Sequence, residues 1–505
     1  MPVRAELAGV ASPDFEVVGG GTIGEKAEQL RSKTPALKSI GFHVPPRTVL
    51  ADGFLGDFMA RNRIDTAKPP ANLERAIRRG SLSQEQFVIL QRTFGSHGSK
   101  PLIIRSSAEG DARGTGIYES EVTDNNIKRG RKILQGVWAS YFSESAVAFR
   151  RDAGLSEGFG VILEPLVGQS FGHGEYFAPV MSGFGYTSTP REGANISVVP
   201  GIGGGVDSRY GEKLTRDRVA IYDYDLSEYI YEESSRMTNV GNSRKSALLG
   251  TAARGWRMHD AMLADVLWKG NEFHSPKMIQ QLFDPGSDLN ETVMSHDFQL
   301  SGFFDMIDQM EQTFGKPQYF EWAVTIEDGE PKYWILQIAD VDAKADYAEF
   351  QEGTPLLSAH TVTGSGQKEC AKIFNCWNPS DIENLRRFNQ ENTGYVLLYP
   401  SRLTTSWGTM FGGPRLKYAD LSNASVIVEI QDANHEGDPI SHFGGQVDMT
   451  GKFFGVLDDD PDNSHDWDTF IAGAVTEEGS EVYQGKVKVV ASERRNKMAV
   501  YPLEE

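Results

Sequence analysis

The chain has 505 residues, of which 39% are hydrophobic and 24% are charged, and its formal net charge at pH 7 is −20. This length predicts two or three domains of an ordinary soluble kind, and the negative charge argues against nucleic acid or an anionic membrane as the main partner. The two cysteines, Cys370 and Cys376, are too few for a disulfide framework or a four-cysteine zinc site, which suits a reducing compartment. Residues 1–16 form an N-terminal tail without an apolar run of signal-peptide length, and no later run is long enough to span a membrane, so we expect a cytoplasmic protein.

The first predicted element is a glycine-rich turn at 17–24 that leads into a helix. Gly19 and Gly24 have the outer spacing of a P-loop, but Glu25 stands where that motif requires lysine, which excludes a Walker A loop. Lys26 follows, so it is a candidate for binding phosphate just after a glycine turn. The alternative is a solvated helix lysine, because most lysines are solvated.

A segment of helical periodicity at 54–95 precedes the sequence PLIIRSSAEGDARGTGIYES, residues 101–120. Here an apolar run ends in Arg105 and two serines, and a loop of small and acidic residues follows. Glycines in such a loop allow backbone amides to approach an anion closely, and Arg105 would add a charge-assisted fork. The pattern indicates a phosphate-binding site, and a strand that ends in a polar turn is the alternative.

Further along the chain, residues 133–155 have apolar positions at helical spacing and carry Arg150. The run VILEPLV at 161–167 is typical of a strand. The glycine cluster GIGGGV lacks the full dinucleotide-binding fingerprint, so it is weak support for a nucleotide site.

The segments YFEWAVTI and KYWILQIA are predicted strands, and the Asp328-Gly329 pair between them is a strong hairpin signal. Glu321 and Gln337 lie on the two strands and could point the same way. A carboxylate and an amide oxygen beside a phosphate site are what a Mg²⁺-nucleotide needs, since Mg²⁺ takes few protein oxygens. The alternative is a surface hairpin with polar residues on its solvated face.

Residues 343–368 contain few large apolar groups, and their GSG sequence predicts a flexible linker. The strand-like runs TGYVLLYP, ASVIVEI and KVKVVA then indicate a second, small and mixed domain over 369–505.

With these segments identified, the chain resembles the pyruvate phosphate dikinase and phosphoenolpyruvate synthase family. The motifs that carry the resemblance, in the family's order, are GGGTIGEKAEQL with GFHVPP, IIRSSAEGD with GTGIYES, WASYFSESAVAFR, VILEPLV, and FEWAV with WILQ. The resemblance covers roughly residues 17–342 and implies a multidomain α/β and α+β fold. An ATP-grasp nucleotide-binding domain would occupy 17–342, followed by the linker at 343–368 and a phosphohistidine-like swivelling β/β/α domain at 369–505.

The resemblance also implies roles for single residues. Lys26 and Arg105 would hold the phosphates of ATP and act in catalysis, while Glu321 and Gln337 would bind Mg²⁺. The strand at 161–167 would carry the adenine hinge. The complete set of nucleotide-binding residues implied by the resemblance is Lys26, Arg105, Gly114, Thr115, Gly116, Arg150, Glu164, Leu166, Glu321 and Gln337.

The family's swivelling domain carries a Thr-Ser-His signature whose histidine accepts phosphate from ATP. This chain has Ile440-Ser441-His442, with Gly451 at the family's distance after the histidine. Ser441 is a suitable helix N-cap, and a phosphoryl group on His442 would lie near a helix N-terminus, where it is favoured. An ordinary loop histidine is the alternative, and His435 is a second candidate.

The chain departs from the family pattern at the hairpin. Tyr319 stands where the family usually has an acidic residue two before the glutamate, and Ala339 stands where an arginine follows the glutamine. Loss of that arginine removes one phosphate contact, so an altered phosphoryl transfer is an open alternative. The residues after 342 are too few for a (β/α)₈ barrel of about 250 residues, so we do not expect the family's pyruvate-binding barrel.

The leading hypothesis is an ATP-dependent phosphotransferase that uses Mg-ATP and His442. Its products, by resemblance, are AMP and a phosphorylated acceptor, and the sequence does not identify that acceptor, whether small molecule or protein. One alternative is a catalytically altered nucleotide-binding protein with a regulatory or assembly role, and another is a subunit of a split dikinase. No nucleic-acid or membrane partner is expected, and homo-oligomer formation stays open.

Overall fold

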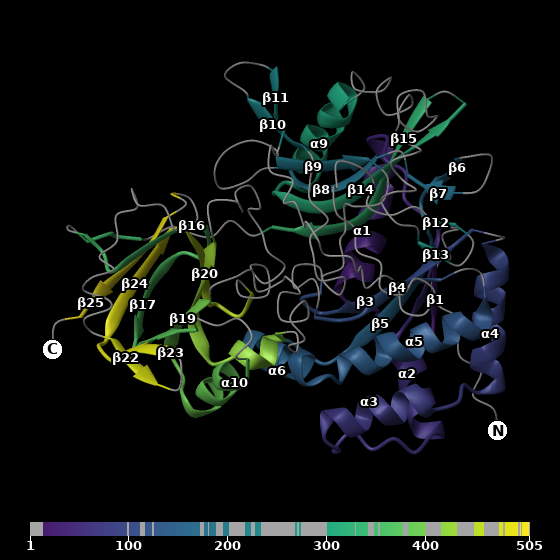
Figure 1. Cartoon of the computed structure of the whole chain (residues 1–505). Helices are drawn as coiled ribbons and strands as arrows, with labels where there is room; N and C mark the ends of the chain where they lie inside the picture. The colour runs from purple at the N-terminus through teal and green to yellow at the C-terminus, as the bar shows by residue number, and fades with distance from the viewer. Residues whose placement is uncertain are drawn as a thin grey trace.

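The structure, a computed structural model of the chain, has a mixed α/β architecture with several sheets (Figure 1), in agreement with the fold class predicted from the sequence at this level. The residues it describes are 14–97, 100–111, 117–123, 126–171, 176–179, 181–187, 195–200, 218–223, 228–233, 268–269, 272–273, 300–328, 330–341, 348–351, 354–376, 382–399, 416–431, 449–458, 474–477, 480–492, 495 and 497–503.

A five-stranded sheet of order β1-β2-β5-β3-β4 forms the base of the N-terminal part. Its strands are β1 (Phe15–Val18), β2 (Arg47–Leu50), β3 (Leu102–Ala108), β4 (Ser120–Thr123) and β5 (Phe159–Pro165). Strands β1 and β2 are parallel, and the other neighbours are antiparallel. Most of the predicted tail at 1–16 lies outside the described residues, and its last two residues, Phe15 and Glu16, belong to β1.

Helices cover one face of this sheet. They are α2 (Asp52–Arg61), α3 (Pro70–Arg79), α4 (Gln84–Ser96), α5 (Ile127–Tyr141) and α6 (Glu144–Ala153). Trp138 of α5 is buried against Phe54 and Phe58 of α2, and Leu102 and Ile104 of β3 belong to the same core. Side chains alternate along a strand, so Arg105 and Ser107 of β3 lie on the opposite face.

That opposite face receives helix α1 (Glu25–Ser39) and a second, six-stranded sheet of order β11-β10-β9-β8-β14-β15. The strands are β8 (Met181–Tyr186), β9 (Asn195–Pro200), β10 (Arg218–Asp223), β11 (Glu228–Glu233), β14 (Gln318–Glu327) and β15 (Glu330–Asp340). Helix α9 (Leu300–Phe314) packs on this sheet through Phe303, whose ring lies 4.6 Å from Trp322 and 5.0 Å from Tyr333.

Strands β14 and β15 form the hairpin that the sequence predicts. Asp328, the first residue of its two-residue connection, has φ 55°, which is the left-handed conformation that Asp-Gly hairpin turns require. A small four-stranded sheet of order β13-β12-β7-β6 lies nearby. It consists of β6 (Gln169–Phe171), β7 (Tyr176–Ala178), β12 (Trp268–Lys269) and β13 (Glu272–Phe273).

The C-terminal part is built on a ten-stranded sheet of order β17-β24-β25-β16-β21-β20-β19-β18-β23-β22. Strands β18, β19, β20 and β21 are parallel to one another, and the remaining pairs are antiparallel. The strands are β16 (Leu357–Thr363), β17 (Gly366–Cys370), β18 (Ile373–Asn375), β19 (Tyr395–Tyr399), β20 (Ala424–Gln431), β21 (Phe453–Asp458), β22 (Ala474–Glu477), β23 (Ser480–Tyr483), β24 (Val487–Ser492) and β25 (Lys497–Pro502). Helix α10 (Ile382–Glu391) and the short helix η3 (Tyr418–Leu421) lie at one side.

The sequence predicts a flexible linker at 343–368. Strand β16 and the first three residues of β17 lie in the second half of this range and are paired within the large sheet. Gly364 and Gly366 have φ 93° and 128°, so these glycines bend the chain between two strands. The division of the chain into domains stays a prediction.

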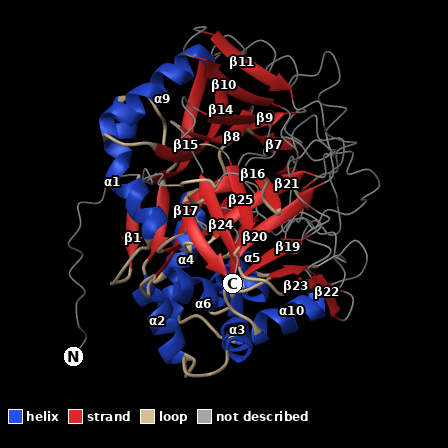
Figure 2. Cartoon of the chain, turned by 90° about the vertical axis from the view of Figure 1, so that its left-hand side faces the viewer, coloured by secondary structure: helices blue, strands red, loops and turns tan. Residues whose placement is uncertain are grey.

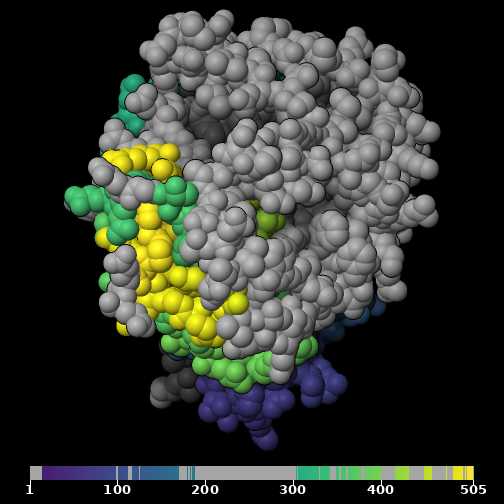
Figure 3. All heavy atoms as spheres, turned by 60° about the vertical axis from the view of Figure 1, so that its left-hand side comes forward, coloured from purple at the N-terminus to yellow at the C-terminus, as the bar shows by residue number. Residues whose placement is uncertain are grey.

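The N-terminal and C-terminal parts share a hydrophobic core. In the view of Figure 2, helices α3, α6 and α10 lie below strands β20, β24 and β25. Phe149 of α6 meets Tyr418 of η3 edge to face at 5.6 Å, and the Tyr418 hydroxyl donates to Asp152 Oδ2 at 3.0 Å. In Figure 3 the yellow C-terminal residues and the green residues beneath them lie above the purple N-terminal residues. None of the helices in the described part of the chain has the length and apolar character of a membrane span.

Asp340, the last residue of β15, anchors the hairpin to α1. Lys33 Nζ of α1 lies 2.5 Å from Asp340 Oδ1, and Lys316 Nζ lies 2.7 Å from Oδ2. Gln318 Nε2 donates to Oδ1 at 3.0 Å. Burial by itself raises the pKa of this carboxyl, but the three hydrogen bonds outweigh burial and lower the pKa from 3.8 to about 2.

We expect Asp340→Asn to lower the free energy of unfolding by about 1 kcal/mol at neutral pH, since the carboxylate is partly exposed to solvent. Because its folded-state pKa is lowered, Asp340 stabilises the fold fully above pH 3.8, and this stabilisation is lost as the pH falls toward 2. Urea unfolding from neutral pH to about pH 2 should therefore show a shallower loss of stability for the variant. Asp305→Asn, at an exposed position of α9, is the control, and parallel profiles for Asp340→Asn and wild type would contradict the assignment.

Candidate functional site

The N-terminus of α1 is seated directly on the end of β3. Gly24 precedes the helix with φ 76°, and a Cβ at this position would overlap the Ser107 carbonyl oxygen. The N-cap residue is Gly24 itself, which has no side chain that could cap the helix. Instead the Ser107 hydroxyl accepts a hydrogen bond from the Ala27 N–H at 3.0 Å, so a residue 80 positions away satisfies one of the unbonded amides of the first turn.

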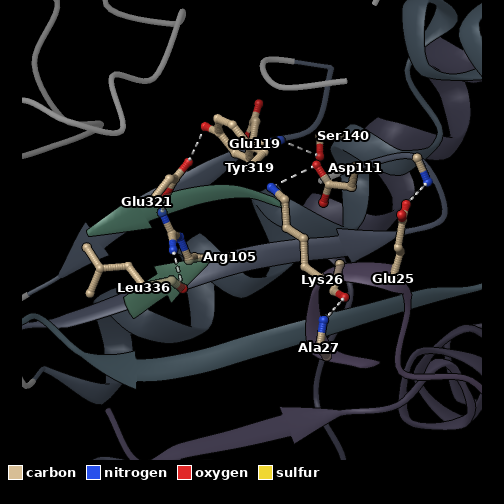
Figure 4. A network of polar contacts seen from close by, with 12 residues as sticks. Glu25, Lys26, Ala27, Arg105, Asp111, Glu119, Ser140, Tyr319, Glu321 and Leu336 are labelled. Atoms are coloured by element: carbon tan, nitrogen blue, oxygen red, sulfur yellow. Dashed lines mark hydrogen bonds and ion pairs between the residues drawn. The ribbon is translucent and has the colours of Figure 1, made fainter. Parts of the chain in front are cut away.

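The same turn of α1 holds the residues that follow β3. Lys26 Nζ lies 3.0 Å from Asp111 Oδ1, and the two side chains are only 8% and 2% exposed. Glu25 Oε2 accepts a hydrogen bond from the Gly110 N–H at 2.7 Å. Figure 4 shows Lys26 rising from α1 toward Asp111, on the same side of the sheet as Arg105.

Arg105 joins the two N-terminal sheets. Its Nη2 lies 2.6 Å from Glu321 Oε2 on β14, and its Nη1 lies 3.4 Å from Glu164 Oε1 on β5. Nη1 also donates to the Leu336 carbonyl at 3.3 Å, and Leu336 is the extra residue of a β-bulge in β15. Burial alone lowers the pKa of the guanidinium, but the two carboxylates raise it above its usual value.

Glu164 is shared with a second buried arginine. Arg47 Nη2 lies 2.9 Å from Glu164 Oε2, and its Nε donates to the same oxygen at 3.0 Å. Burial lowers the pKa of Arg47, and Glu164 opposes that effect. Two arginines and the carboxylates of Glu164 and Glu321 thus form a network in which the formal charges cancel, as burial of ions requires.

Glu321 and Gln337 are cross-strand partners in the hairpin, so the register brings together the two residues predicted to bind a metal. Both are buried, with exposed fractions of 5% and 1%. Tyr319 is on the same face two residues earlier, and its hydroxyl donates to Glu321 Oε1 at 3.4 Å. Burial and the charge of Glu321 raise the pKa of Tyr319, which keeps this hydroxyl neutral.

Glu321 and Gln337 offer two oxygen ligands, which suits Mg²⁺ better than a metal whose ligands all come from protein side chains. The described residues contain no group of three or more His, Cys, Asp or Glu side chains that could hold a metal ion. Mg²⁺ takes few protein oxygens and completes its shell with phosphate and water, so one carboxylate and one amide suffice beside a nucleotide.

Arg150, Glu164 and Leu166 are placed differently from the Lys26–Arg105–Glu321 group. The guanidinium of Arg150 stacks 3.7 Å above the Tyr141 ring, and its Nη1 donates to the Tyr141 carbonyl at 2.7 Å. The Leu166 N–H donates to the Pro101 carbonyl at 2.8 Å, which uses this donor inside the protein. The carboxylate of Glu164 pairs with Arg47 and Arg105. Contacts of these three residues with a nucleotide stay predictions.

Several predicted site residues lie outside the described residues. They are Gly114, Thr115 and Gly116 of the glycine loop, and His435, Ser441 and His442 of the histidine segment.

Three residues of the site were missed in the sequence. Asp111 belongs to a loop that the sequence marks only as small and acidic, and it lies three residues after the end of β3. Arg47 is the first residue of the short strand RTVL, and its burial beside Glu164 has no clear signal in the sequence. Ser107 was recognised as part of the Arg-Ser-Ser motif, but capping of a distant helix has no local signature.

The contact between the N-terminus of α1 and Ser107 can be tested by substituting glycines of the turn that precedes the helix. Gly24→Ala combines an unfavourable positive φ with overlap of the Ser107 carbonyl, so we expect a loss of about 2–4 kcal/mol in the free energy of unfolding. Gly20→Ala is the matched control, since no atom lies within 4 Å of a Cβ built there, and it should change stability by less than about 0.5 kcal/mol. Chemical unfolding of both variants measures the difference, and equal effects would show that α1 does not depend on this contact.

The sequence matches the family model described as pyruvate phosphate dikinase, AMP/ATP-binding domain, over residues 59–352. The matched range contains Arg105, Glu321 and Gln337, and it begins after Lys26. The search of curated proteins gave no match. Because the family match spans more than half of its length, the chain belongs to the pyruvate phosphate dikinase family and contains that family's AMP/ATP-binding domain.

Proposed function

We propose that the chain is an ATP-dependent phosphotransferase that passes phosphate from Mg-ATP through a histidine to an acceptor. The observation that carries the proposal is the convergence of Lys26, Arg105 and Glu321, from α1, β3 and β14, in a chain with an AMP/ATP-binding domain. The five-stranded and six-stranded sheets would be the two parts of an ATP-grasp domain. The ten-stranded sheet, starting at β16, would contain the swivelling domain.

Lys26 and Arg105 supply the positive charge that phosphoryl transfer needs. Catalysis of this chemistry rests on positioning the phosphates and on stabilising the charge that develops on their oxygens. Arg105 is pre-positioned by Glu164 and Leu336, so little reorganisation is required when phosphate arrives. Glu321 and Gln337 would hold Mg²⁺, which supplies further charge neutralisation between phosphate oxygens.

The position of Met449 supports a histidine relay. Met449 is the first described residue after the segment that carries His442, and it follows that histidine by seven residues. Its methyl carbon lies 2.6 Å from the point where a Cβ on Gly110 would be, so Met449 packs against the residues that follow β3. An AMP product requires attack of the imidazole nitrogen at the β-phosphorus, which breaks the bond from the β-phosphorus to the bridging oxygen that AMP keeps. The β- and γ-phosphoryl groups are then both on His442, so the γ-phosphoryl must pass to water or inorganic phosphate before the β-phosphoryl reaches the acceptor.

Incubation with Mg²⁺ and ATP labelled at the β-phosphate tests the relay. We expect acid-labile label on the wild-type protein and AMP in solution, and we expect His442→Ala to lose at least about 90% of the label because its nucleophile is absent. His435→Ala is the matched control and should retain the label. Equal labelling of wild type and His442→Ala would overturn the relay through this residue.

A second candidate function is nucleotide binding without phosphoryl transfer, in a regulatory or assembly role. The observation that favours it is the register of the hairpin, in which Tyr319 and Ala339 are directly opposite each other. Both departures from the family pattern therefore fall at one place. Ala339 is fully buried and carries no charge, so it does not supply the positive charge of the arginine that the family has at this position.

Nucleotide products separate the two functions. The phosphotransferase predicts AMP release that falls at least about 100-fold in Glu321→Ala, because the carboxylate proposed to hold Mg²⁺ is lost. Glu327→Ala, on the same strand and beside the hairpin turn, should leave AMP release unchanged. The binding role predicts ATP-dependent thermal stabilisation of wild type with no AMP or ADP formed by any of the three proteins.

The acceptor is a further part of the proposal. It would be a small molecule or a protein that binds this chain, or it would bind a separate chain if the protein is one subunit of a split dikinase. We propose neither nucleic acid nor membrane as a partner, since the net charge of −20 repels both. Homo-oligomer formation is compatible with this proposal.

A further inference from the structure

Lys26 occupies a position where a lysine is unfavourable without an anion. It is the second residue of α1, and the N-terminal end of a helix carries partial positive charge that repels a cation. The lysine is also almost entirely buried, so water does not offset this repulsion. A buried cation in such a position requires a counter-ion.

Asp111 is that counter-ion in the structure described here. Its Oδ1 lies 3.0 Å from Lys26 Nζ, and the residue is 1% exposed. Asp111 Oδ2 is buried and has no hydrogen-bond partner among the described residues. An unsatisfied carboxylate oxygen in a buried site is costly, so packing stability alone does not explain an aspartate at this position.

We propose that Asp111 is a positioning residue that holds Lys26 until a phosphate group of the nucleotide takes its place. The proposal rests on the proposed function in one respect, namely that Lys26 binds phosphate. Lys26 cannot neutralise a carboxylate and a phosphate fully at the same time. Phosphate binding therefore exchanges one anion for another at Lys26, and the negative charge of Asp111 stays beside the ligand.

Asp111 consequently selects for nucleotide that already carries its metal. Metal-free ATP brings about four negative charges to the site and Mg-ATP about two, so repulsion by Asp111 weakens the metal-free form more. The residue makes Lys26 available to ligands whose charge is already reduced. It also lowers occupancy of the site by free phosphate compounds that cannot react.

Asp111→Asn tests the proposal, because asparagine keeps the shape and the hydrogen bond to Lys26 but removes the charge. Calorimetric titration of the full chain with ATP in EDTA should show about tenfold tighter binding than wild type. Titration with Mg-ATP should show a gain of about threefold, and titration with adenosine should show no change beyond about twofold. Glu28→Gln is the matched control: it removes one exposed carboxylate from the same helix, where Glu28 pairs with Arg31, and should leave all three affinities unchanged within about twofold.

A double-mutant cycle shows whether Asp111 affects ATP binding through Lys26. In a Lys26→Gln background, Asp111→Asn should improve the binding of metal-free ATP by about threefold instead of about tenfold, since the repulsion of the ligand by Asp111 remains but the exchange at Lys26 no longer exists. If Asp111→Asn does not fold, Asp111→Ser removes the same charge and carries the same test. The proposal is overturned if Asp111→Asn binds metal-free ATP no more tightly than wild type. It is also overturned if Asp111→Asn gains as much affinity in the Lys26→Gln background as in the wild-type background.

The failure of this proposal differs from the failure of the proposed function. If wild type binds ATP but the cycle shows no coupling, Asp111 is a structural residue and the phosphotransferase proposal is unaffected. If wild type binds neither ATP nor Mg-ATP, both proposals are wrong.

Discussion

A buried guanidinium must be surrounded by carboxylates, and Arg105 meets this requirement by drawing them from two different sheets. Glu164 comes from the sheet that contains Arg105, and Glu321 comes from the hairpin of the second sheet. The hairpin cannot move away from β3 without leaving a charge buried and unpaired, which costs several kcal/mol. The position of Glu321, and with it that of Gln337, therefore depends on one arginine.

The same principle extends across the site. Lys26 is neutralised by Asp111, Arg47 by Glu164, and Lys33 by Asp340, so each of these basic side chains is matched to an acid of the protein. If Lys26 binds phosphate as proposed, the phosphate replaces Asp111 instead of meeting a bare cation. Under this proposal, local cations held in place by the protein's own acids provide the phosphate site in a protein with net charge −20.

Sequence reasoning succeeded where the signal was local. The hairpin was predictable because Asp328-Gly329 fixes its turn, and the helices at 54–95 were predictable from apolar spacing. It failed where the cause is distant: the glycines at 364–366 suggested flexibility, but pairing with β24 and β25 orders the strands around them. Asp111 was not singled out, since its importance comes from a lysine 85 positions earlier.

The distances along the chain between partners at the site have a consequence for the order of folding. Arg105 and Glu321 are 216 residues apart, and Lys33 and Asp340 are 307 apart. Contacts of such sequence separation form late, because a long loop must close before they contribute. During synthesis, Arg105 of β3 and Lys33 of α1 stay solvated until β14 and β15 have been made. Nascent chains that end before residue 318 therefore lack Glu321 and Gln337, the residues proposed to hold Mg²⁺, and completion of the site reports completion of the N-terminal fold.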